Sequence, residues 1–272
     1  MWIGISSGSR IAELSRRRFA MLAAATIMPE KPASPAPVPR VRALTFDVFG
    51  TVTDWRSAVI RDGRELSRQT GINADWGAFA GRWRGAYLPE LDRVRRGEIP
   101  WTRLDVLHRH ALDRLLAEFG IAGLSEDQKR WLNLAWHRLP AWPDVPLALQ
   151  RLRSRFITAT LSNGDLAMLV EISKYAGLTW DCVLSSELAR HFKPDRETYR
   201  KAAELLDLEP DQIIMVAAHF DDLEGAHSAG FRTAYVHRPH EYGPGYKMPS
   251  RPAFAFDFEA RDLQHLADLM EA

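Results

Sequence analysis

A carboxylate that could act as a nucleophile follows the first apolar run of the sequence. Asp47 comes directly after residues 41–46, and Gly50 then permits a sharp backbone turn whose exposed amides can hold an anion. A carboxylate held in such a loop can form a covalent intermediate with a substrate. Asp47 could also do no more than cap the turn, so the loop by itself leaves its role open.

Further polar groups follow apolar runs at 162–165, 185–187 and 217–222. In an open parallel sheet, ligands bind beyond the carboxyl ends of the strands. If these apolar runs are strands of one sheet, the polar groups meet Asp47 at one end of it and form a site. The plainer alternative is that they start the helices that follow, because Ser, Asn and Asp are good N-caps.

Alternating strands and helices are predicted from residue 142 onward. Short runs of apolar and β-branched residues predict strands, and longer runs with helical periodicity predict helices. Such alternation implies parallel strands joined by right-handed crossovers, so the expected fold class is α/β with a doubly wound parallel sheet. The expected strands lie at 41–46, 156–161, 182–184, 213–217 and 233–236, and the expected helices at 147–152, 165–176, 195–206, 223–229 and 262–270.

A helical block is inserted just after the first strand. Residues 55–139 show no strand-like alternation, and their apolar residues recur at helical spacing, with breaks at 93–100 and 120–125. Ser125 is a good N-cap for the stretch that follows it. Because the block follows the carboxyl end of the first strand, we expect it to lie over the site as a lid.

The N-terminal 40 residues are set apart from the folded chain. Arginines at 16–18 precede a short apolar run at 20–28, a pattern typical of a twin-arginine export signal. An unstructured leader or a misassigned start codon is the alternative, so the location stays open between periplasm and cytoplasm. Five prolines at 29–39 predict an extended linker. The expected division is a leader and linker at 1–40, a core at 41–56 and 141–272, and a helical cap at 57–140.

Composition and charge exclude several classes of function. The 272 residues carry a formal net charge of +1, which gives no indication of a nucleic-acid or membrane partner, and no stretch of the folded part reads as a transmembrane helix. Cys182 is the one cysteine, which excludes an intramolecular disulfide and a thiolate metal cage. No glycine fingerprint of an oxidoreductase follows the first strand. A homodimer is the default expectation for the assembly.

Four motifs resemble those of the haloacid dehalogenase superfamily. They appear in the expected order, each at a predicted strand end or in the loop beyond it, and the resemblance covers residues 41–272. It implies a Rossmann-like core with an inserted helical cap. The motifs are FDVFGTVTD at 46–54, LSNG at 161–164, Lys193-Pro194 with Tyr199 following, and VAAHFDD at 216–222.

Phe49 distinguishes between the subfamilies. The phosphatases of this superfamily carry an aspartate two residues after the nucleophile, which protonates the leaving group. Phenylalanine cannot donate a proton, and this departure matches the 2-haloacid dehalogenases, whose halide leaves without one. Segments 82–87 and 237–243 also resemble that subfamily. The resemblance therefore implies hydrolysis of short 2-halo carboxylic acids through an ester on Asp47, with inversion at C2 and with no metal or cofactor.

The resemblance also implies the roles of the residues that act in the attack. Asp47 attacks C2, Lys193 keeps Asp47 ionised, and Thr51 hydrogen-bonds to it. Arg84 and Asn163 stabilise the departing halide as its charge develops. The alternatives to Arg84 in the same region are Arg82, Arg93, Arg95 and Arg96.

The remaining roles concern the substrate and the hydrolytic water. Ser162, with loop amides, would hold the substrate carboxylate, and Tyr199 would support the lysine end of the site. Asp222, aided by Asp221, would position the water and Lys193. The residues expected to contact substrate are Val48, Phe49, Ser162, Asn163, Arg84, Trp55, Tyr199 and His219.

The fourth motif departs from the subfamily pattern. Ser and Asn are common there, whereas this chain has Ala217, Ala218, His219 and Phe220. His219 could take over the role of the amide near the water, or it could titrate near neutrality and make activity pH-dependent. Two alternatives remain beside the dehalogenase: a magnesium-dependent phosphatase or phosphonatase on the same fold, and a non-catalytic binding protein.

Overall fold

A parallel sheet of six strands forms the centre of the described chain. The computed structural model describes residues 41–247 and 249–272, so the predicted leader and linker at 1–40 lie outside the described residues. The strands run in the order β3-β2-β1-β4-β5-β6, and every neighbouring pair is parallel, as predicted for a doubly wound sheet. The strands are β1 (Ala43–Phe46), β2 (Ile157–Ser162), β3 (Cys182–Ser185), β4 (Ile213–Ala217), β5 (Arg232–Val236) and β6 (Phe258–Ala260).

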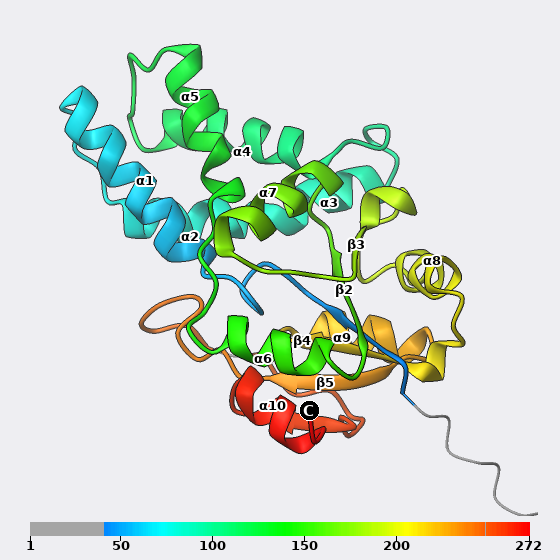
Figure 1. Ribbon diagram of the computed structural model, residues 1–272. Helices are drawn as coiled ribbons and strands as arrows, with labels where there is room; N and C mark the ends of the chain where they lie inside the picture. Colours follow the sequence, from blue (N-terminus) through cyan, green and yellow to red (C-terminus); the bar gives the residue numbers. More distant parts are fainter. Residues whose placement is uncertain (1–40, 248) are drawn as a thin grey trace, which may run out of the picture. The chain divides into compact units, whose positions relative to one another are not determined.

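Helices cover both faces of this sheet (Figure 1). Successive strand residues point to opposite faces. In β4, Ile214 and Val216 therefore join the apolar cluster that includes α6, α7 and α10, whereas Ile213 and Met215 join the cluster that includes α8 and α9. Strands buried on both faces read as continuous apolar runs in the sequence. The helices are α6 (Val145–Arg153), α7 (Leu166–Ala176), α8 (Arg196–Leu206), α9 (Phe220–Ser228) and α10 (Leu263–Leu269), with 3-10 turns η2 (Ser186–Leu188) and η3 (Pro210–Gln212).

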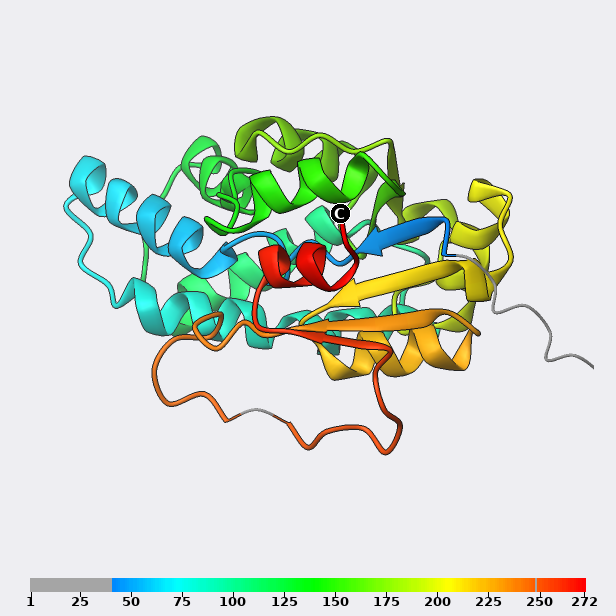
Figure 2. The same ribbon diagram turned by 60° about the horizontal axis from the view of Figure 1, so that its bottom comes forward.

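Residues 55–139, predicted to be helical, form helices and connecting loops and contain no strand. Ser125 and Gln128 form a reciprocal capping box at the start of α5. The arrowheads of the strands point toward this block in Figure 2, so it lies beyond the carboxyl ends of the sheet, where ligands bind in such folds. Its elements are α1 (Trp55–Thr70), α2 (Trp76–Gly85), α3 (Tyr87–Arg95), α4 (Leu104–Glu118), α5 (Glu126–Asn133) and the 3-10 turn η1 (Leu134–His137).

The structure differs from the sequence prediction in three elements. Helix α9 begins at Phe220, three residues before the predicted start, so Asp222 lies in its first turn. Acidic residues are stabilised there by the helix dipole. Helix α3 continues into the predicted break at 93–100, where Arg93 pairs with Glu90 one turn earlier. Strand β6 was not predicted, because its three residues are too few to show an alternating pattern.

The division into core and cap remains a proposal. Helix α1 begins at Trp55, two residues before the proposed cap at 57–140. One buried apolar cluster joins the helices of this block to β1 and β4. The proposed core at 41–56 and 141–272 therefore shares its apolar interior with the cap.

Stacked aromatic rings join the helical block to the loop after β1. Trp136 stacks on Trp55, with ring centroids 5.9 Å apart, and on His108, with centroids 4.4 Å apart. The same indole meets Phe49 edge-on at 5.9 Å. All four rings are buried. Such aromatic pairs add to the stabilisation that comes from burial itself.

Replacing Trp136 with alanine should lower the free energy of unfolding by about 3–5 kcal/mol, because the surrounding rings cannot close the cavity. Denaturant unfolding followed by circular dichroism measures this change. Leu147→Ala is the control, because Leu147 is 59% exposed and its truncation should change stability by less than about 0.5 kcal/mol. A loss below about 1 kcal/mol for Trp136→Ala would contradict a structural role for the stack.

Candidate active site

The loop after β1 places Asp47 at the carboxyl end of the sheet. The backbone N–H of Asp47 donates to the carbonyl oxygen of Val216 on β4 at 3.0 Å, so the loop starts in register with the sheet. Gly50 has a φ of +87°, a left-handed conformation that glycine adopts without strain. The carbonyl oxygen of Thr51 accepts a hydrogen bond of 2.8 Å from the Arg238 side chain. Both ends of the turn are therefore fixed by neighbouring elements.

Three donors surround the carboxylate of Asp47. Thr51 Oγ1 and His219 Nδ1 lie 2.7 and 3.0 Å from Oδ2. Lys193 Nζ donates to Oδ1 at 3.0 Å. Lys193 and His219 thus contact different oxygens of the carboxylate. The structure thus brings together the aspartate, the lysine and the threonine that the sequence motifs assigned to one site.

A second buried carboxylate shares the same lysine. Lys193 Nζ donates to Asp222 Oδ2 at 2.5 Å, and the Tyr199 hydroxyl donates to Asp222 Oδ1 at 2.7 Å. Lys193 precedes Pro194 in the loop before α8, whereas Asp222 lies in the first turn of α9. All of these polar side chains are buried. One ammonium group therefore bridges two carboxylates.

The neighbouring charges set the ionisation of each group. Burial alone would raise the pKa of Asp47, but the charge of Lys193 and the hydrogen bonds from His219 and Thr51 hold that pKa well below its usual range. Burial alone would lower the pKa of Lys193, and its two carboxylate partners raise it instead. Burial raises the pKa of Asp222 to about 6, with Lys193 opposing the shift and Asp47 adding to it. Both carboxylates are therefore ionised at neutral pH, but Asp222 takes up a proton much more readily than Asp47 does.

The second motif holds the lysine loop in place. Asn163 Oδ1 accepts from the backbone N–H of Lys193 at 2.7 Å, and Asn163 Nδ2 donates to the carbonyl oxygen of Lys193 at 3.2 Å. Ser162 is fully buried, and its hydroxyl accepts from the Gly164 N–H at 3.3 Å. Asn163 lines the cavity described next, and Ser162 does not. The expected contact between Ser162 and a substrate carboxylate stays a prediction.

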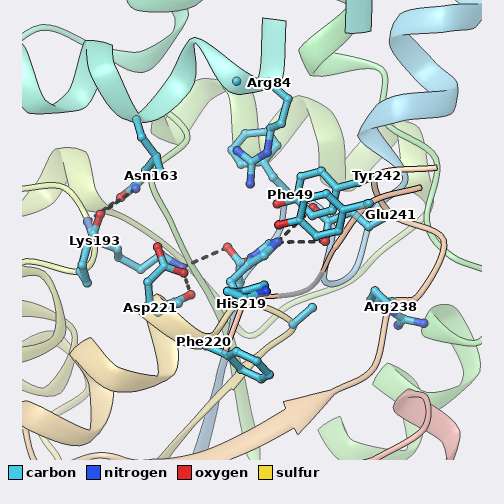
Figure 3. A pocket seen from close by; sticks show the side chains of 18 of the residues that line it. Phe49, Arg84, Asn163, Lys193, His219, Phe220, Asp221, Arg238, Glu241 and Tyr242 are labelled. Carbon is cyan, nitrogen blue, oxygen red and sulfur yellow. Dashed lines mark hydrogen bonds and ion pairs between the residues drawn. The ribbon is translucent and has the colours of Figure 1, made fainter. Parts of the chain in front are cut away.

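A cavity of about 670 Å³ lies above Asp47, lined by the strand ends and by the helical block. Arg84 enters it from α2 (Figure 3), with its guanidinium carbon 5.8 Å from the ring centre of Trp55. The cation of Arg84 and the carboxylate of Asp47 therefore line the same cavity. The alternative arginines do not line it and pair with carboxylates elsewhere; they are Arg82, Arg93, Arg95 and Arg96.

Phe49 fills the place where a phosphatase would carry its acid. The ring is 2% exposed, lines the cavity, and packs against Trp136, His108 and the backbone at Gly164. A ring held in this way is fixed and can donate no proton. The other expected contacts Val48, Trp55 and Tyr199 are buried behind the cavity and do not line it.

Glu241 belongs to the site, although sequence reasoning did not identify it. Its carboxylate is 2% exposed and lies 2.9 Å from His219 Nε2 and 3.0 Å from Trp55 Nε1. Burial alone would lower the pKa of His219, but the charge of Glu241 and the contact with Asp47 raise it well above its ordinary value. Titration of His219 near neutrality is therefore not expected. The resemblance of segment 237–243 was the available signal for Glu241.

Two features are absent from the part of the chain that the structure describes. Within residues 41–247 and 249–272, no three or more His, Cys, Asp or Glu side chains are grouped as they would be around a metal ion. No helix in these ranges has the length and apolar character that a membrane crossing needs.

Comparison with known proteins agrees with this geometry. The model of the haloacid dehalogenase-like hydrolases matches residues 41–230. The chain belongs to this family. Among curated members, (S)-2-haloacid dehalogenase 1 of Pseudomonas sp. strain CBS-3 is 32% identical over 216 residues, which cover 74% of this chain and 88% of that protein. (S)-2-haloacid dehalogenase 4A of Burkholderia cepacia is 31% identical over 220 residues, which cover 75% and 88%.

Solved structures of haloacid dehalogenases share the whole described fold. The L-2-haloacid dehalogenase PA0810 is 41% identical, with a TM-score of 0.82, and the match covers 85% of this chain and 99% of that one. The defluorinating L-2-haloacid dehalogenase Rha0230 is 37% identical, with a TM-score of 0.83 and coverage of 85% and 96%. The α/β core with an inserted helical cap is therefore the fold of this hydrolase.

The lowered pKa of Asp47 should appear in the pH dependence of stability. A carboxylate whose pKa is depressed by folding stabilises the protein above its unfolded-state pKa of about 4, and this contribution is lost as the pH falls. Between pH 7 and pH 3, the wild type should lose about 1 kcal/mol of unfolding free energy relative to Asp47→Asn. Urea unfolding of both proteins at each pH measures the difference. An unchanged difference would mean that Asp47 titrates as it does in the unfolded chain.

Proposed function

We propose that this hydrolase displaces halide from short 2-halo carboxylic acids and yields the 2-hydroxy acid with inversion at C2. The observation that carries the proposal is the buried carboxylate of Asp47, which pairs with Lys193 and lines a cavity in which Arg84 supplies a cation and Phe49 stands in place of a proton donor. A carboxylate in this setting can attack carbon, and a halide needs a cation and no proton when it leaves.

The first step is a displacement at C2 of the substrate. One oxygen of Asp47 bonds to C2 from the side opposite the halogen, the carbon–halogen bond breaks with its electron pair, and the halide departs. Arg84, on the far side of the cavity, stabilises the negative charge that develops on the halogen. Lys193 and Thr51 fix the direction of the carboxylate during the attack.

The second step is hydrolysis of the ester on Asp47. Water attacks the side-chain carbonyl carbon, so C2 is not touched again and the single inversion is retained. Asp222 is the base for this water, because its pKa of about 6 leaves it ionised at neutral pH yet able to take a proton. Lys193 contacts both carboxylates and can return that proton to the departing product oxygen.

The two alternatives have less support. A phosphatase needs an acid near the leaving group, and the fixed ring of Phe49 stands at that place. A binding protein needs no ionised nucleophile, and burial of the charges of Asp47, Lys193 and Asp222 would then only cost stability. The named relatives act on (S)-2-haloacids, and we infer the same substrate class and enantiomer for this chain.

Halide should be released from chloroacetate and (S)-2-chloropropionate in the presence of EDTA. Over many turnovers in ¹⁸O-labelled water, the label should enter the carboxyl group of Asp47, because water attacks the ester on that side chain. Ion chromatography measures the halide, and mass spectrometry of the peptide measures the label. Halide release without label in Asp47 would exclude the ester route, and activity that EDTA abolishes would favour the metal-dependent alternative.

Arg84→Met should lower the rate of halide release by about 10²-fold, because the developing halide loses the cation that lines the cavity. Arg82→Met is the matched control. Arg82 lies on the same helix but is exposed and pairs with Glu118, so its loss should leave kcat unchanged. Equal effects of the two substitutions on kcat would contradict the role of Arg84.

A further inference from the structure

The two oxygens of Asp47 have different surroundings. Oδ2 faces both Thr51 Oγ1 and His219 Nδ1, whereas Oδ1 has only the contact with Lys193 Nζ among the described residues. The backbone N–H of Ala218 donates to Thr51 Oγ1 at 3.0 Å, which directs the threonine hydroxyl proton toward Oδ2. Two donors leave Oδ2 little capacity to form a new bond. Oδ1 is therefore the attacking oxygen, and Oδ2 becomes the carbonyl oxygen of the ester.

Glu241 fixes the direction of the His219 ring. Both carboxylate oxygens of Glu241 lie 2.9–3.0 Å from His219 Nε2, so that nitrogen donates and the other nitrogen, Nδ1, faces Asp47. Trp55 Nε1 also donates to Glu241. A Cβ atom at Gly50 would come within 2.1 Å of the Glu241 carboxylate, so only glycine leaves space for it. His219, Trp55 and the backbone at Gly50 therefore hold the Glu241 carboxylate in place.

The arrangement supplies a cation at Oδ2. Burial alone would lower the pKa of His219, but the negative charge of Glu241 raises it, so both ring nitrogens carry protons at neutral pH. Burial alone would raise the pKa of Glu241, but the charge of His219 and, to a lesser extent, that of Arg84 lower it and keep the carboxylate ionised. A protonated imidazole cannot act as the base for water. It can donate from Nδ1 to an oxygen whose negative charge grows.

We propose that His219, positioned by Glu241, forms with Thr51 the oxyanion hole for hydrolysis of the ester on Asp47. This inference rests on the proposed function, and it assigns residues to the second step of that reaction, the hydrolysis of the ester. His219 is a catalytic residue in this account, because it touches the reacting carboxyl group. Glu241 is a positioning residue that acts through His219. Together they replace the serine and asparagine that resemblance led us to expect in the fourth motif.

Water adds to the carbonyl carbon of the ester, one of its protons passes to Asp222, and the carbonyl electron pair moves onto Oδ2, facing Thr51 and His219. The intermediate collapses, the bond from that carbon to Oδ1 breaks, and Oδ1 leaves as the product hydroxyl with a proton from Lys193. Asp222 then returns its proton to Lys193, and the new carboxyl group of Asp47 releases the remaining proton to solvent.

The cation has opposite effects on the two steps. Before attack, its charge stabilises the Asp47 carboxylate and so makes Oδ1 a weaker nucleophile. After attack the ester is neutral, and the cation stabilises the oxyanion more than the ester carbonyl, which speeds hydrolysis. Weakening the cation should therefore spare ester formation and slow ester hydrolysis. A residue with a merely structural role would slow both steps together.

The test follows both steps in Glu241→Gln, which preserves shape but removes the charge that keeps His219 protonated. With (S)-2-chloropropionate, this variant should release one halide per site in a burst and then turn over at least about 10-fold more slowly than wild type. Intact-protein mass spectrometry after acid quench should show the ester accumulating. His219→Ala should give the same burst with a loss of about 10²-fold, and His219→Asn, which restores a donor, should recover part of it.

A second histidine–glutamate pair provides the control. His237 and Glu259 are 2.9 Å apart but exposed on the surface, away from the cavity, so Glu259→Gln should behave as wild type. Wild-type protein that releases no halide from any haloacid would refute the proposed function and this inference together. Wild-type activity with no ester accumulation in either Glu241→Gln or His219→Ala would refute the inference alone.

Discussion

The site depends on one condition: Asp47 must stay ionised although it is buried and two further carboxylates, those of Asp222 and Glu241, lie nearby. Moving a charge from water into a protein is costly unless an opposite charge compensates it. Five side chains provide this compensation by forming a row in which negative and positive charges alternate, and each side chain lies within 3.0 Å of the next. In order they are Glu241, His219, Asp47, Lys193 and Asp222. Because a cation lies on each side of Asp47, this residue keeps its negative charge although it is buried.

The parallel sheet assembles this row from distant parts of the chain. Asp47 follows β1, and Asp222 lies just beyond the neighbouring strand β4. Glu241 lies in the segment after β5, next to β4, and Lys193 is tied through Asn163 to the loop after β2, on the other side of β1. The loops and helix starts after four adjacent strands, β2, β1, β4 and β5, therefore position this row at the same end of the sheet. The helical block then adds Arg84 to the lining of the cavity.

The residues at the strand ends could be predicted because a local sequence pattern is enough to place them. Buried parallel strands read as apolar runs, and the polar residues directly after them, such as Asp47 and Asn163, must lie at one end of the sheet. The start of α9 was predicted too late, because Phe220 and the acidic residues beside it resemble a loop until the packing of the helix on β4 and β5 is known. Even so, Asp222 itself was identified, since its motif follows a strand.

Residues whose role depends on tertiary contact were harder to predict. Arg84 was one of five arginines in its region, and only the cavity shows which of them faces Asp47. Glu241 lies in an irregular segment without periodicity, and its partners are His219, directly before α9, and Trp55, the first residue of α1. Its place against Gly50 is a contact between two loops that no local pattern encodes. Ser162 shows the converse, because a motif residue can be too deeply buried to line the cavity.

The most direct test of this account is the titration of Asp47 itself. Carbon-13 NMR of protein labelled at the aspartate carboxyl carbons, with Asp47→Asn for assignment, reports the ionisation of this one side chain. The Asp47 signal should remain that of a carboxylate as the pH falls to about 3, well below the ordinary aspartate range near 4. A signal that titrates at pH 4 or above would show that the two cations do not hold the charge, and the proposed nucleophile would lose its basis.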